Sequence, residues 1–172
     1  PSILNAKGNL YLRGYFQHPD YFAPITDQLY KEMTIVTSPT PQNREMLNQI
    51  HDVNSVSLHI RRGDFVSDEA TNRTHGILPM HYYTSAISKI AERVQNPHFF
   101  IFSDDMNWVE QNLKLNYSMT RVRQNSADTD FEDLRLMMSC KHQIIANSSF
   151  SWWGAWLNTH NEKIVIASSW WR

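Results

Sequence analysis

The feature that most limits how this chain can fold is the point where residues 55–60 meet Arg61 and Arg62. Apolar side chains recur at every second position of residues 55–60, which predicts a β-strand. The strand delivers both arginines to its C-terminal end, and Gly63 follows. Open α/β sheets bind their ligands at this edge. We therefore expect a charged turn that serves a binding site at the end of a sheet strand.

The two adjacent arginines allow two interpretations. Their guanidinium groups repel each other, and a phosphate or pyrophosphate that accepts paired hydrogen bonds would relieve that repulsion. Gly63 would let the backbone turn close to such an anion. Alternatively, the arginines are solvated or paired with acids that follow them, which are Asp64, Asp68 and Glu69. A motif this short does not decide between the two.

Strand-like and helical segments alternate along the rest of the chain. We expect strands near residues 56, 99, 143 and 164 and helices near residues 82, 107, 133 and 154. This alternation predicts a parallel sheet with right-handed crossovers, and hence an α/β, Rossmann-like domain. A chain of 172 residues is long enough for one such domain with a sizeable core.

The remaining segments carry further expectations. Helices are expected at residues 20–33 and 43–50, a weak strand at 117–122, and a long functional loop at 65–76 because its apolar residues show no period. A strong helix is expected at residues 130–140, with an apolar face of Phe131, Leu134, Met137 and Met138.

Polar residues follow three of the expected strands. They are Arg61 and Arg62, then residues 103–105, then residues 147–149. Because the C-terminal ends of neighbouring parallel strands line one crevice, we expect these groups to converge. Ser148, Ser149 and the N-terminus of the helix after them would then complete an anion site with hydroxyl and backbone N–H donors.

Asp133 lies on the helix that precedes the serine loop. Its carboxylate could read a nucleobase that presents adjacent N–H donors, as guanine does. It could equally be an exposed ion-pair partner of Arg135 or Lys141. The sequence leaves both possibilities open.

Asp104 and Asp105 suggest a metal site, but a helix N-terminus explains two acids equally well. The histidines show no clustered spacing, so we expect no zinc. The arginines could neutralise a diphosphate, so a metal is unnecessary for that task. No Gly-rich turn follows any expected strand, and no G-x-S-x-G elbow is present. These absences argue against NAD-dependent hydride transfer, P-loop phosphoryl transfer and serine hydrolysis.

Charge and cysteine content limit the classes of partner and the compartment that suit this chain. The formal net charge is −1 and the basic residues are dispersed, which argues against a nucleic-acid binder. Cys140 is the one cysteine and lies in an apolar helical stretch, so it is interpreted as a buried small residue rather than a nucleophile. A chain without disulfides suits a reducing compartment, and we expect a cytoplasmic location. No run approaches the about 20 apolar residues that span a bilayer.

Taken together, three ordered motifs resemble the bacterial α-1,2-fucosyltransferases of glycosyltransferase family 11. They are His59-Ile60-Arg61-Arg62-Gly63-Asp64, Phe102-Ser103-Asp104-Asp105 with Trp108, and residues 146–157, which read ANSSFSWWGAWL. The resemblance runs from about residue 10 to the end of the chain.

This resemblance implies a GT-B-like, inverting enzyme that transfers L-fucose from GDP-β-L-fucose to the 2-hydroxyl of a galactose-containing glycan acceptor without a metal or other cofactor. It also implies that the chain is the C-terminal part of a longer protein. Residues 1–50 would end an acceptor-side region and linker, and residues 51–172 would form the Rossmann-like domain that binds the GDP-sugar.

The resemblance also assigns roles to residues. Arg61 is similar to the arginine that contacts the β-phosphate of GDP, with His59 and Arg62 beside it. The related α-1,6-fucosyltransferases imply that Asp133 and Ser149 contact the nucleotide. Their proposed base falls on Glu69, while Asp64 and Asp68 remain alternatives for accepting the proton of the acceptor hydroxyl.

Two other functions stay open from the sequence. The chain could be a non-catalytic nucleotide- or anion-binding module, or a GT-B sugar transferase that uses another nucleotide. Peripheral association with the inner face of a membrane is a further expectation that the family resemblance brings.

Overall fold

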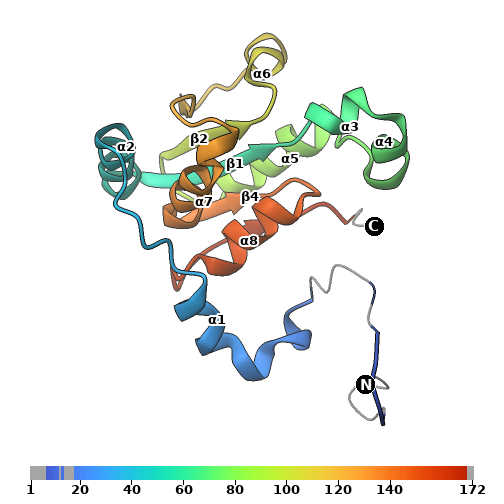
Figure 1. Ribbon diagram of the computed structural model, residues 1–172. Helices are drawn as coiled ribbons and strands as arrows, with labels where there is room; N and C mark the ends of the chain where they lie inside the picture. Colours follow the sequence, from blue (N-terminus) through green and yellow to red (C-terminus); the bar gives the residue numbers. More distant parts are fainter. Residues whose placement is uncertain (1–6, 12, 14–17, 170–172) are drawn as a thin grey trace. The chain divides into compact units, whose positions relative to one another are not determined.

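The computed structural model describes residues 7–11, 13 and 18–169 (Figure 1). Contacts between residues divide the chain into two compact units, residues 1–33 and residues 34–172. The second unit contains the whole sheet and also the helix α2, Pro41–Asp52. The predicted assignment of residues 1–50 to an acceptor-side region stays a prediction.

The first unit has short helical turns where one helix was expected. Two 3₁₀ turns, η2 at Pro19–Tyr21 and η3 at Ala23–Ile25, precede α1 at Thr26–Glu32. Pro24 lies in the first turn of η3. A proline fits there but lacks the N–H that a continuous α-helix would need. The predicted helix over residues 20–33 is therefore correct only in its last part.

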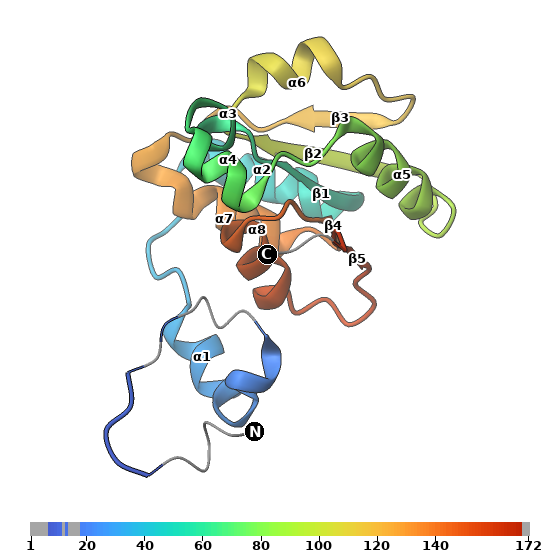
Figure 2. The ribbon, with the colours of Figure 1, turned by 90° about the vertical axis from the view of Figure 1, so that its right-hand side faces the viewer.

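The second unit is built on a five-stranded sheet in which every pair of neighbours is parallel. The strands are β1 (Asn54–Ile60), β2 (Pro97–Ser103), β3 (Ser118–Arg121), β4 (His142–Ile144) and β5 (Val165–Ile166). Their order is β3-β2-β1-β4-β5, which is also the order of the labels from top to bottom in Figure 2. The α/β, Rossmann-like fold is thus confirmed.

Helices cover both faces of this sheet. The longer ones in the second unit are α2, α5 (Met80–Ala91), α6 (Met106–Asn112), α7 (Asp130–Ser139) and α8 (Ser149–Leu157). Figure 2 shows α5 on one side of the strands and α7 and α8 on the other. None of the helices in the described part of the chain is long and apolar enough to cross a membrane.

Two hydrophobic clusters correspond to these two faces, and β2 contributes to both. Phe99 and Ile101 pack with α5 and α6, whereas Phe100 and Phe102 pack with residues of α2 and α7. A strand buried on both faces has no polar side to display. This explains the unbroken apolar run that predicted a central strand.

The order in which the strands are added to the sheet reverses at β1. β1 connects to β2 and then β3 on one side, and the chain then returns through α7 to place β4 on the other side of β1. Such a switch point opens a crevice at the C-terminal ends of the strands. In Figure 1, β1 runs from α2 toward α3 (Gly63–Ser67), so this edge lies on the side of α3 and α4 (Glu69–His75).

Residues 65–76 are not a loop, so that prediction is wrong. The chain forms α3 at Gly63–Ser67 and α4 at Glu69–His75. Phe65 is buried, and Asn72 donates a hydrogen bond of 2.7 Å to its carbonyl oxygen. Each helix is too short to show an apolar period, and local polar contacts stabilise both.

The expected apolar face of α7 is confirmed at Met137 and wrong at Phe131. The helix buries Glu132, Leu136 and Met137, while Phe131 is 37% exposed. The Glu132 carboxylate accepts a hydrogen bond of 2.9 Å from Arg135 Nε, and this pairing allows its burial. The buried surface of α7 therefore includes a paired acid that its apolar residues did not indicate.

Gln143 in β4 joins two helix ends from inside the core. Its Nε2 donates to the carbonyl oxygens of Met137 in α7 and Gly154 in α8, at 2.9 and 3.1 Å. Both carbonyls lie in the last turn of their helices, where intrahelical partners run out, and the Met137 oxygen also accepts from the backbone N–H of Cys140 at 3.2 Å. We expect Gln143→Leu to lower the free energy of unfolding by about 2–3 kcal/mol in urea denaturation. The exposed Gln111→Leu is the control, and an equal loss there would contradict this explanation.

Candidate functional site

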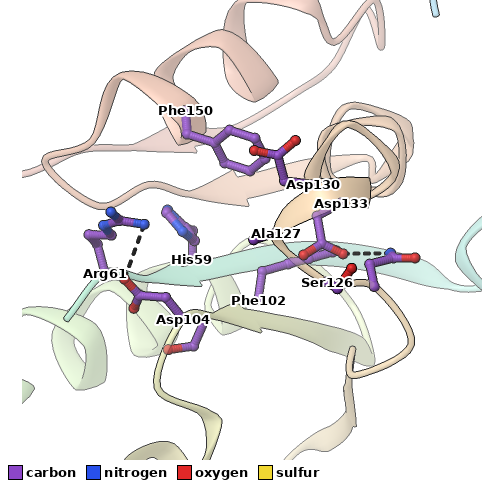
Figure 3. A pocket seen from close by; sticks show the side chains of 11 residues that line it. His59, Arg61, Phe102, Asp104, Ser126, Ala127, Asp130, Asp133 and Phe150 are labelled. Carbon is purple, nitrogen blue, oxygen red and sulfur yellow. Dashed lines mark hydrogen bonds and ion pairs between the residues drawn. The ribbon is translucent and has the colours of Figure 1, made fainter. Parts of the chain in front are cut away.

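A pocket of about 410 Å³ lies at the C-terminal edge of the sheet (Figure 3). It draws on the ends of β1 and β2, the segment after β3, and the beginnings of α7 and α8. Its lining residues are His59, Arg61, Phe102, Ser103, Asp104, Asn125, Ser126, Ala127, Asp130, Asp133 and Phe150. The predicted convergence of strand ends is thus seen for β1 and β2, with β3 and α7 as further contributors.

Arg61 lies at one end of the pocket. Its Nε and Nη2 donate to Asp64 Oδ1 at 3.1 and 2.8 Å, and its Nη1 lies 3.1 Å from Asp104 Oδ2. Because a guanidinium has five N–H groups, two stay outside these contacts. The expected pairing with Asp64 is therefore present, and the arginine still has donors for an anion.

Arg62 does not line the pocket, although we expected both arginines in one crevice. Its backbone N–H donates to Asp104 Oδ1 at 2.8 Å, and its Nε donates to Asp105 Oδ2 at 3.3 Å. Its guanidinium lies 3.8 Å from the ring centroid of Trp108. Consecutive residues of an extended chain point in opposite directions, which explains why only one arginine faces the pocket.

The two adjacent aspartates have different structural tasks. Asp105 caps α6, because its Oδ1 accepts a hydrogen bond of 3.0 Å from the backbone N–H of Trp108. Asp104 joins the two arginines that follow β1. The helix-cap interpretation is thus confirmed for Asp105. No group of three or more potential metal ligands occurs among the residues that the structure describes.

His59 forms part of the pocket wall between Arg61 and Asp133 (Figure 3). The residue is 5% exposed, and its Nδ1 has no hydrogen-bond partner among the described residues. Burial, reinforced by the charge of Arg61, lowers the pKa of His59 to about 3. The imidazole is therefore neutral at physiological pH, and its Nδ1 is a buried atom without a partner among the described residues.

Asp133 lies at the opposite end of the pocket from Arg61 in Figure 3. Its Oδ1 accepts a hydrogen bond of 2.7 Å from Asn125 Nδ2. Burial raises the pKa of Asp133, the hydrogen bond from Asn125 lowers it, and the charges of Asp130 and Glu132 raise it further. The carboxylate thus faces the pocket, and it forms no ion pair with any residue that the structure describes.

The alternative partners suggested for Asp133 are occupied elsewhere. Arg135 pairs with Glu132, and Lys141 Nζ donates to Asn54 Oδ1 at 3.2 Å. The interpretation of Asp133 as an exposed ion-pair partner is therefore wrong.

The expected serines and the expected base lie outside the pocket lining. Ser148 is the N-cap residue of α8 but makes no side-chain capping bond, and Ser149 is exposed in its first turn. Phe150 is the residue of this turn that reaches the pocket. Glu69 on α4 is 90% exposed by its side chain and pairs with Arg73 at 2.8 Å.

Four lining residues were not chosen from the sequence. Asn125 and Ser126 follow β3, and Phe102 and Phe150 lie in motifs of the family resemblance that assigned them no role. A polar segment directly after a strand that neighbours β2 is the one signal that could have pointed to the first two.

Comparison with known proteins gives a family match. The chain matches the family described as Glycosyl transferase family 11 over residues 2–172. It is 37% identical over 166 residues to an alpha-1,2-colitosyltransferase of Escherichia coli, a match that covers 96% of this chain and 57% of that protein. To the O-antigen biosynthesis glycosyltransferase WbnK of Escherichia coli it is 34% identical over 179 residues, covering 98% and 57%.

A more distant relative is human galactoside alpha-(1,2)-fucosyltransferase 1, which is 24% identical over 146 residues. That match covers 80% of this chain and 40% of the human protein. The chain therefore spans little more than half the length of the two bacterial relatives.

Gly63 allows a close approach that another residue would prevent. A Cβ added at this position would overlap the carboxylate of Asp104. We expect Gly63→Ala to lower the free energy of unfolding by about 1–3 kcal/mol through this overlap. Urea denaturation measures the loss, and in an Asp104→Ala background the same substitution should cost less. Equal costs in both backgrounds would contradict the steric explanation.

The buried His59 predicts a pH dependence of stability. Unfolding restores its pKa from about 3 to 6.5, so the unfolded state binds a proton that the folded state does not. Wild-type stability therefore falls as the pH drops from 6.5 toward 3. We expect His59→Gln to lose this component, so that its stability relative to wild type rises over that range in thermal melts.

The exposed His51→Gln is the matched control, because it leaves His59 in place. Parallel pH profiles for wild type and His59→Gln would show that the buried imidazole is not responsible.

Proposed function

Because this chain belongs to glycosyltransferase family 11, we propose that it forms the nucleotide-sugar-binding part of an inverting α-1,2-fucosyltransferase. The donor would be GDP-β-L-fucose, and the acceptor the 2-hydroxyl of a galactose-containing glycan. The observation that carries this proposal is the pocket with Arg61 at one end and Asp133 at the other. A guanosine diphosphate is complementary to this arrangement, because it has an anionic diphosphate at one end and the N–H donors of guanine at the other.

The diphosphate would lie against Arg61. Its two unengaged N–H groups can donate to phosphate oxygens, while Asp64 and Asp104 hold the guanidinium in place. The neutral imidazole of His59 would lie beside the same phosphates. An arginine already fixed by carboxylates loses little further freedom when the ligand binds.

The guanine would lie against Asp133. Guanine presents N1–H and the 2-amino group side by side, and a carboxylate can accept from both. Uracil offers one N–H between two carbonyl oxygens, which a carboxylate repels. The pocket should therefore prefer GDP to UDP.

In the proposed reaction the bond between the anomeric carbon and the β-phosphate oxygen breaks, and its electron pair leaves with GDP. Arg61 would interact most strongly with the charge that develops on that oxygen. The galactose 2-hydroxyl forms the new bond and gives its proton to a carboxylate. Glu69 fits the role of this base better than Asp64. Asp64 is bound to Arg61, whereas Glu69 faces solvent and forms only a weak, exposed ion pair.

Colitose is the alternative to fucose as the transferred sugar. A bacterial relative is named for colitosyl transfer, whereas the human relative is named for fucosyl transfer. Transfer assays on the full-length protein should therefore offer both sugars as GDP derivatives. A non-catalytic nucleotide-binding module would bind GDP and transfer neither.

Arg61 would neutralise the leaving diphosphate without a metal. A cytoplasmic location with peripheral membrane association stays a prediction. Ser148, Ser149 and Arg62 would support the nucleotide indirectly, through the backbone of their turns.

We expect calorimetric titration in EDTA to show saturable binding of GDP and weaker binding of UDP. Arg61→Ala should weaken GDP binding at least about tenfold, because charge-assisted hydrogen bonds are lost. Arg73→Ala is the matched control, since that arginine forms an exposed pair on α4. Equal affinity for UDP, a requirement for Mn²⁺, or no binding to either the folded chain or the full-length protein would contradict the proposal.

A further inference from the structure

We propose that Asn43 is a positioning residue for the base end of the pocket and, through Asn125, sets its selectivity for guanine. The proposal rests on the proposed function, because it takes Asp133 as the group that reads the base. Asn43 lies in α2, far along the chain from the other two residues, and does not line the pocket.

Asn43 is 1% exposed, and its side chain makes a dense set of hydrogen bonds. Its Nδ2 donates to Asn125 Oδ1 at 2.8 Å, and its Oδ1 accepts from Asn125 Nδ2 at 3.2 Å and from Gln124 Nε2 at 3.0 Å. Asn125 Nδ2 also donates to Asp133 Oδ1 at 2.7 Å. The four side chains therefore form one network that ends at the carboxylate in the pocket.

The charge of Asp133 fixes the direction of this network. An ionised carboxylate only accepts hydrogen bonds, so Asn125 must present its amide nitrogen to it. Asn125 then presents its oxygen to Asn43 Nδ2, which leaves Asn43 Oδ1 to accept from Gln124. Each amide has one orientation that satisfies all of its partners, and the network as a whole holds Asp133 in one position.

The side chain of Asn43 is not needed by its own helix. Thr40 caps α2, because its Oγ1 accepts from the backbone N–H of Asn43 at 3.2 Å. The hydrogen bonds of the Asn43 side chain go instead to the segment after β3, at residues 124 and 125. Asn43 therefore positions the segment after β3, part of which lines the pocket, and not its own helix.

The position of the Asp133 carboxylate depends on these hydrogen bonds, because burial and neighbouring acids disfavour its ionised form. Asp130 and Glu132 lie near it on α7, and Asp104, Asp105 and Arg123 line the adjacent hollow with it. Among the described residues its hydrogen-bond donor is the neutral amide of Asn125. Loss of Asn43 would free Asn125, and the carboxylate could then turn away from the base.

The test compares GDP with IDP, whose base lacks the 2-amino group but is otherwise the same. Wild type should bind GDP about tenfold more tightly, because IDP forms one charge-assisted hydrogen bond fewer with Asp133. In Asn43→Ala, GDP loses two oriented bonds and IDP loses one. We expect the GDP-to-IDP preference to fall to within about threefold, as measured by calorimetry on the 172-residue chain.

Asn158→Ala is the matched control. Asn158 is 2% exposed and its Nδ2 donates to the Cys140 carbonyl oxygen at 2.6 Å, away from the pocket lining. We expect it to lower stability while keeping the wild-type preference. If Asn43→Ala does not fold in a thermal melt, the half-buried Asn125→Ala decides the question, since it breaks the same network beside Asp133.

The outcomes separate the two proposals. A wild-type chain that does not prefer GDP to UDP contradicts the proposed function. A wild-type chain that prefers GDP to both UDP and IDP, with the same GDP-to-IDP ratio in the folded variant, overturns the role of Asn43 alone. Equal weakening of both purine nucleotides would show a structural role and would also overturn it.

Discussion

The bridge that Asp104 makes between the ends of two strands is the interaction on which the pocket depends. One carboxylate oxygen accepts from the backbone N–H of Arg62, and the other pairs with the Arg61 guanidinium. β1 is thereby joined to the residue that follows β2, beyond their ladder of backbone hydrogen bonds. Gly63 makes the approach possible because it has no Cβ to meet the carboxylate. The position of Arg61 in the pocket follows from this joint.

The two carboxylates that bind Arg61 have opposite effects on its ability to bind an anion. Asp64 and Asp104 fix the guanidinium but also reduce the positive potential that an anion meets. The neutral state of His59 means that the imidazole adds no charge of its own. A diphosphate would therefore be bound by directed hydrogen bonds more than by net charge, which favours a ligand of defined geometry over a simple anion.

The sequence predicted the features that follow from regular periods. Alternating and continuous apolar runs located β1 and β2, and the parallel order placed Arg61 and Asp104 at one edge. It failed where tertiary contacts override a local pattern. Glu132 of α7 is buried because it pairs with Arg135, which no apolar pattern indicates, and Asn43 gave no signal because its partners are 81 and 82 residues away. Short polar helices such as α4 have no period to detect.

The three acids in the first turn of α7 show how one helix can serve both the core and the site. Glu132 is buried but paired with Arg135, whose Nη2 donates to the Thr37 carbonyl oxygen at 2.5 Å. Asp130 is exposed at the pocket and keeps its hydration. Asp133 is half-buried and forms no ion pair in the described part of the chain, and burial raises its pKa. A carboxylate kept under such conditions, with a neutral amide to orient it, is better explained by a ligand that donates to it than by a contribution to stability.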